Sequence, residues 1–135
     1  MKKIIITFSI VLFAVVVPFL EINHTHVFSP HLTPHGKIHE VWQLITNSSI
    51  GLLCFWLVWV KNDTKISAVL SLLVMGGFLL AYCLKESYGG SMTILDSNEK
   101  TIFGINIGVL GFGTAFLLIL IVLGTTIRSD RKRFY

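Results

Sequence analysis

The most constraining feature of the sequence is a set of four long apolar stretches separated by short polar segments. The stretches cover about residues 4–22, 41–60, 66–84 and 102–127. A transmembrane helix needs about 20 mostly apolar residues, and each stretch meets or nearly meets that length. A membrane β-barrel would instead show alternating segments of about 10 residues, and no such segments occur. Because backbone groups in lipid must be hydrogen-bonded within the protein, the pattern predicts four transmembrane helices.

The composition supports one all-α membrane domain over residues 1–135. Apolar residues make up 53% of the chain and charged residues 13%, about half the charged share of average soluble domains. Disordered chains combine low hydrophobicity with high net charge, so that class is excluded. An ordinary soluble domain would lack the polar groups to cover its surface. We therefore predict a polytopic four-transmembrane-helix bundle.

Basic residues at the ends of the stretches predict the orientation of the bundle. Eight of the 11 Lys and Arg residues lie in the N-terminal segment, the loop after the second stretch and the C-terminal tail. These regions share one side, so both termini are expected in the cytoplasm, with the protein in a bacterial inner membrane or a plasma membrane. No nucleic-acid partner is expected, because the chain has no basic stripe and no recognition module.

The first stretch follows Lys2 and Lys3 and could be a signal peptide. It lacks a small-x-small cleavage site before Glu21, so a retained helix is the favoured interpretation. Pro18 lies near the far end of this helix, where a kink costs least.

The histidines form the chemical centre of the sequence, since all five lie in one short segment. They are His24, His26, His31, His35 and His39. Within the segment, Thr33 is a plausible N-cap and Pro34 a good first helical residue. The second helix is therefore expected to begin as early as residue 34.

A helix that begins there carries a polar stripe from the surface into the outer leaflet. The stripe consists of His35, His39, Gln43 and Asn47. Polar groups in lipid normally face the bundle interior or a water-filled cavity. We therefore expect an outward-facing polar pocket in the outer half of the bundle, lined by Glu21, His39, Glu40, Gln43, Asn47 and Asn106.

Three interpretations of this pocket are open. It could bind, or act by proton transfer on, a small lipophilic molecule; the candidate catalytic residues are then Glu21, His39 and Glu40. The candidate ligand-binding residues are His35, His39, Gln43, Asn47 and Asn106.

In the second interpretation the protein binds a transition metal, because histidines at i and i+4 can chelate one ion and a carboxylate can complete the set. The candidate metal ligands are the five histidines, although no H-E-x-x-H motif is present. In the third interpretation the protein is a structural subunit of a membrane complex, its histidines meet lipid headgroups and its polar stripe joins helices.

Two further features concern packing. Gly104 and Gly108 form a G-x-x-x-G pair, which predicts either a homodimer or close packing within the bundle. Cys54 and Cys83 differ in depth by roughly 16 Å at 1.5 Å per residue. Since a disulfide needs Cα atoms within about 7 Å, we expect two free thiols.

One short segment carries a resemblance. Asn23-x-Thr25-His26 is followed by Pro30 and then by Pro34-His35-x-x-x-His39. This pattern resembles a family of small, uncharacterised four-helix membrane proteins with an N-x-T-H…P-H-x-x-x-H motif. More distantly, the layout is similar to the EXPERA group, which includes sterol isomerase and the sigma-2 receptor, and to DoxX-like proteins. In the EXPERA group, carboxylates at the first and second helices line a lipid-ligand cavity. The resemblance therefore implies a pocket for a lipid-like ligand, with Glu21 and Glu40 in comparable places.

Overall fold

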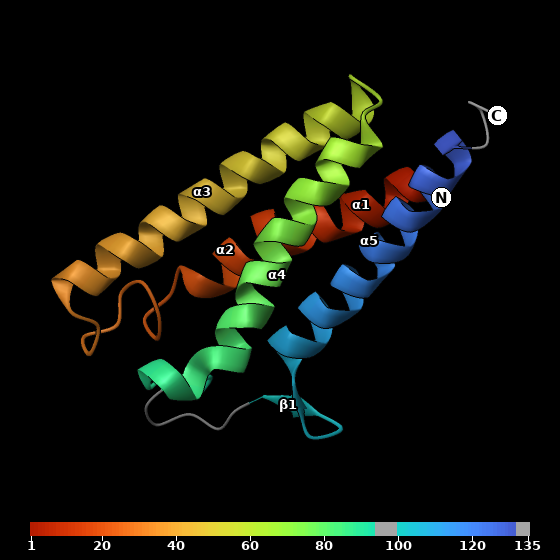
Figure 1. The fold of residues 1–135 in the computed structure, drawn as a ribbon. Coiled ribbons are helices and arrows are strands. Elements are labelled where there is room, and N and C mark those ends of the chain that lie inside the picture. The colour runs from red at the N-terminus through yellow and green to blue at the C-terminus, as the bar shows by residue number, and fades with distance from the viewer. Residues whose placement is uncertain (94–99, 132–135) are drawn as a thin grey trace.

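The computed structural model describes residues 1–93 and 100–131 and shows a bundle of four long helices (Figure 1). Each is long and apolar enough to cross a membrane, which confirms the predicted all-α four-helix architecture. The first span is continuous but contains a π-helical turn. In chain order the elements are α1 (Lys2–Val11), η1 (Leu12–Val16), α2 (Val17–Glu21), α3 (Pro34–Trp59), α4 (Thr64–Tyr88), β1 (Thr101–Ile102), β2 (Ile105–Asn106) and α5 (Ile107–Arg131).

The helices run antiparallel to their neighbours in sequence, so the connections gather at two ends (Figure 1). The start of α1, the α3–α4 turn and the end of α5 lie at one end. The α2–α3 loop and the β1–β2 hairpin lie at the other, which we call the loop end. α1 packs against α3, α4 and α5 and so forms the centre of the bundle.

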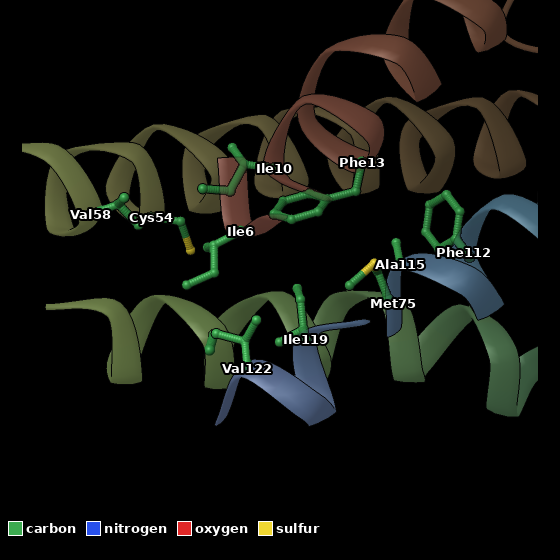
Figure 2. Packing of buried hydrophobic residues seen from close by; sticks show 11 residues of the cluster. Ile6, Ile10, Phe13, Cys54, Val58, Met75, Phe112, Ala115, Ile119 and Val122 are labelled. Carbon is green, nitrogen blue, oxygen red and sulfur yellow. The ribbon is translucent and has the colours of Figure 1, made fainter. Parts of the chain in front are cut away.

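The core is a narrow apolar seam along α1 (Figure 2). Ile6 of α1 and Phe13 of η1 are fully buried there, in one cluster with Met75 of α4 and Ile119 of α5. Many other large apolar side chains are exposed, for example Leu52 at 74%. An apolar exterior around a thin core is what lipid, rather than water, would solvate.

Side-chain caps explain where two of the helices begin. The Thr33 hydroxyl oxygen accepts a hydrogen bond from the Gly36 N–H at 3.0 Å, and Pro34 is the first residue of α3. This confirms the predicted start of the second helix. Asp63 caps α4 in the same way by accepting from the N–H groups of Lys65 and Ile66.

The π-helical turn of the first span precedes Pro18. Proline has no N–H, so the carbonyl four residues earlier, that of Ala14, loses its helical donor. The Ser48 hydroxyl of α3 donates to this carbonyl at 3.0 Å. The hydrogen bond therefore satisfies, from a neighbouring helix, a backbone group that lipid could not satisfy.

One turn further along α3, Gly51 lies directly against Ala14. A Cβ atom built on Gly51 would be 2.2 Å from the Ala14 Cβ. Only glycine permits this close approach of α3 to the first span. The serine and the glycine thus fix the contact between the two helices at the proline site.

The fourth span begins later than predicted, at Ile107 rather than near residue 102. Residues 101–106 instead form a hairpin in which Ile102 pairs with Ile105. Its two central residues, Phe103 and Gly104, have φ values of 52° and 76°, as two-residue hairpin turns require. The Asn106 side chain then accepts hydrogen bonds from the first turn of α5, so the helix starts there.

This hairpin also corrects the glycine prediction. Gly104 lies in the turn and only Gly108 lies in α5, so the two do not share a helix face. A homodimer stays a prediction without this structural basis.

The cysteines are both free, with Cys54 buried and Cys83 exposed. Cys54 contributes to the α3–α4 contact, where the Ser67 hydroxyl donates to the Cys54 carbonyl at 3.2 Å.

Candidate functional site

The α2–α3 loop is organised by one residue, Asn23. Its side-chain oxygen accepts hydrogen bonds from the Thr25 N–H at 2.6 Å and the His26 N–H at 3.1 Å. Val27 is buried, and its N–H donates to the Glu21 carbonyl at the end of the first span. The loop therefore folds back over the end of the first span instead of extending into solvent.

This arrangement positions His26 between a hydroxyl and a carboxylate. The Thr25 hydroxyl lies 2.9 Å from Nδ1, and the Glu21 carboxylate lies 3.0 Å from Nε2. The Thr25 hydroxyl donates its one proton to the Asn23 side-chain oxygen at 2.7 Å, so at Nδ1 it acts as an acceptor for the ring N–H. The Nε2 atom then contacts the Glu21 carboxyl group, and a proton on either of these two groups completes that hydrogen bond. The three residues of the Asn23-x-Thr25-His26 pattern thus share one structural task, which is to hold the His26 ring on Glu21.

Next to this pair lies a pocket of about 460 Å³ at the loop end. Three of the five histidines face it, together with one carboxylate from α3. Its lining residues are His24, Thr25, His26, Ser29, Pro30, His31, Leu32, Glu40 and Thr93. The pocket therefore combines imidazole, hydroxyl, carboxyl and apolar groups in one small volume.

Glu40 is the most unusual group in the pocket. Its Oε1 atom is buried and, within residues 1–93 and 100–131, has no hydrogen-bond partner. Burying an unpaired polar atom costs about 1–3 kcal/mol, and more for a charged group. Glu40 is also close enough to Glu21 for the two carboxyl groups to interact electrostatically. The wall of the pocket thus contains a buried acceptor that no donor of the described residues satisfies.

The other two histidines lie outside this pocket. His35 and His39 are exposed on the first turns of α3, and their Nε2 atoms are 3.0 Å apart. The His39 ring also lies against Trp42, with ring centres 5.9 Å apart. Gln43, the next residue of the predicted stripe, is exposed as well.

The expectation of one pocket lined by six residues is therefore corrected. Of the six, Glu40 lines the pocket and Glu21 is joined to it through His26. His39 and Gln43 lie on the exposed face of α3, Asn47 is part-buried further along that helix, and Asn106 caps α5. Their roles in binding stay predictions.

The buried side of α3 explains why Glu40 and not His39 faces inward. Leu44, Gly51 and Val58 are buried and recur every seven residues. Glu40 lies one turn before Leu44 on the same side, whereas His39 is displaced by about 100° around the axis. In the sequence, this repeat of small and apolar residues indicates which side of α3 is buried. The prediction followed the polar stripe instead and therefore assigned the wrong side.

The five histidines do not form one metal centre. Among the residues that the structure describes, no three or more His, Cys, Asp or Glu side chains form a group that could hold a metal ion. The histidines instead divide into the pocket group and the exposed pair of His35 and His39.

Comparison of the chain with models of protein families, with curated proteins and with solved structures gives no match. The resemblance to small four-helix membrane proteins and to the EXPERA and DoxX-like groups thus stays a prediction, and the site is interpreted from its own geometry.

Proposed function

We propose that this multi-pass membrane protein binds a small lipophilic molecule in the pocket at its loop end. The observation that carries the proposal is the buried, unpartnered Oε1 atom of Glu40 in a pocket lined by three histidines. Rotation of the Glu40 carboxyl group would turn this atom toward the pocket, where a ligand hydroxyl or amine would donate to it. The apolar part of the ligand would contact Pro30 and Leu32 or extend toward the bilayer.

The position of the pocket supports a ligand of this chemistry. If lipid surrounds the four apolar helices, the pocket lies at the boundary between hydrocarbon and water, where an amphipathic molecule is itself most stable. Ligand sites are typically concave and largely apolar, with a few polar groups that fix orientation. Glu40 and the histidines would supply those groups.

The direction that the pocket faces is also part of the proposal. The start of α1 and the α3–α4 turn lie at the end of the bundle opposite the loop end (Figure 1), and these segments carry Lys2, Lys3, Lys61 and Lys65. On the positive-inside rule we propose that both termini lie in the cytoplasm and that the pocket faces the outer side of a bacterial inner or plasma membrane.

Lipid mass spectrometry of the purified protein tests the proposal. The wild-type chain, extracted in a mild detergent, is expected to retain one lipophilic species enriched over the bulk lipids. The Glu40→Ala variant should lose most of it. Glu86→Ala is the matched control, because Glu86 is also a carboxylate at the loop end but its side chain is 89% exposed. Absence of any enriched species, or equal retention by both variants, would contradict the proposal.

A further inference from the structure

The exposed pair of His35 and His39 on α3 lies outside the proposed pocket, and its two rings are close together. The Nε2 atoms of His35 and His39 are 3.0 Å apart, and the two rings meet edge to face at 79°. Both residues belong to the first two turns of α3, which the Thr33 cap and Pro34 hold in place. The backbone that carries the pair is therefore preorganised.

The separation of the two nitrogens can be compared with that of a metal site. Two imidazole ligands at 2.0–2.1 Å from a tetrahedral zinc ion have nitrogens about 3.3 Å apart. The observed pair needs to open by only about 0.3 Å to reach this geometry. At this distance one Nε2–H donates to the other Nε2, so an ion takes the place of that proton and the donating ring carries its own proton on Nδ1 instead.

We propose that His35 and His39 together bind one divalent transition-metal ion, such as Zn²⁺, through their Nε2 atoms. Imidazole suits zinc, copper and nickel, whereas magnesium and calcium prefer oxygen ligands. The remaining positions of the ion are open to water or to an external ligand, because the structure places no third metal-binding side chain of its described residues beside the pair.

One electrostatic effect opposes the ion and limits its affinity. The pair lies near the positive end of the α3 dipole, which weakens binding of a divalent cation by about three- to thirtyfold at an exposed site. Removing a group that only hydrogen-bonds to a metal ligand already weakens metal affinity by about 10–100-fold. A ligand itself contributes more than such a group, so two chelating imidazoles outweigh a penalty of that size. The site is thus expected to bind zinc with moderate affinity.

Zinc titration by calorimetry tests the pair on the full chain in detergent, without a polyhistidine tag and after chelator has been removed. We expect one Zn²⁺ per chain. His35→Gln and His39→Gln should each weaken zinc binding at least about tenfold. Loss of a metal ligand lowers the affinity by no less than loss of a residue that hydrogen-bonds to a ligand. Glutamine preserves a polar, helix-compatible side chain at these exposed positions, and circular dichroism checks the fold.

The double variant His24→Gln/His31→Gln is the matched control, because it removes two histidines from the pocket and leaves the pair intact. It should bind Zn²⁺ as the wild type does. Absence of zinc binding, unchanged binding in both single variants, or loss of binding in the control would each overturn the proposal. The Glu40→Ala test of the pocket is unaffected by any of these outcomes.

Discussion

Replacing Gly51 with alanine should disrupt the contact between α3 and the first span. The added Cβ would lie 2.2 Å from the Ala14 Cβ, whereas carbon atoms in contact are about 3.5–4.0 Å apart. The helices would therefore have to separate by about 1.5 Å at this point. Neither atom can move aside, because each is a Cβ fixed to a helical backbone.

The expected cost follows from two opposing effects. Overpacking typically destabilises a protein by about 1–3 kcal/mol, and the rigidity of this contact places it in the upper part of that range. Alanine is better than glycine in a helix by about 1 kcal/mol, which offsets part of the cost. Gly51→Ala should thus lower the free energy of unfolding by about 1–2 kcal/mol.

The reciprocal change at Ala14 supplies the decisive control. Ala14→Gly alone loses helix propensity and packing, at a cost of about 1 kcal/mol. In Ala14→Gly/Gly51→Ala the methyl group at the contact is moved from the first span to α3. The double variant should therefore be about as stable as the wild type. The two substitutions should therefore couple favourably by about 2–3 kcal/mol.

Thermal unfolding in detergent, followed with a thiol-reactive dye, measures these differences. In a Cys83→Ser background, the dye reports exposure of buried Cys54. Gly51→Ala should lower the midpoint by several degrees, about 4–8 °C, and Ala14→Gly should restore it. A Gly51→Ala variant as stable as the parent, or a double variant less stable than either single one, would refute the inferred close approach.

Three further predictions concern single side chains. Ser48→Ala should destabilise the bundle by about 1 kcal/mol in the same assay, because it leaves the carbonyl upstream of the proline unpaired; Ser49→Ala, which removes only a hydroxyl bonded within its own helix, should have little effect. Thr33→Ala should cost about 1 kcal/mol through loss of the α3 cap, and an unchanged midpoint would argue against that cap. In the folded wild-type protein a maleimide should label Cys83 rapidly and Cys54 only after unfolding; equal labelling rates would contradict the packing of α3 on α4.

Much of the fold could be predicted from the sequence because lipid imposes one requirement on every span. Apolar length identifies the four helices, and a Thr-Pro pair identifies the start of α3. The hairpin could not be predicted in the same way, since Ile102 and Ile105 extend the apolar pattern of the fourth span. Only the backbone conformation of Phe103 and Gly104 distinguishes a turn there from another turn of helix.

The candidate site was predictable in its location but not in its grouping. Clustered histidines and two carboxylates predicted a polar site at the loop end, and three of the histidines and Glu40 line one pocket there. Spacing within α3 placed His35 and His39 on one face, as observed, but did not show that this face points away from the core. Which side of a helix is buried depends on its partner, and here the partner contacts are set by Gly51 and its neighbours, which carry no polar signal.

The π-helical turn connects the packing of the first span to the site. A π turn contains about one residue more than an α turn, so residues beyond it are rotated by about 100° relative to an uninterrupted helix. Without it, the apolar Leu20 would lie at about the angle that Glu21 now takes, and His26 would lose its carboxylate partner. The Ser48 hydrogen bond to Ala14 lies within this turn. The π-helical turn that precedes Pro18 therefore helps to position Glu21 beside the pocket.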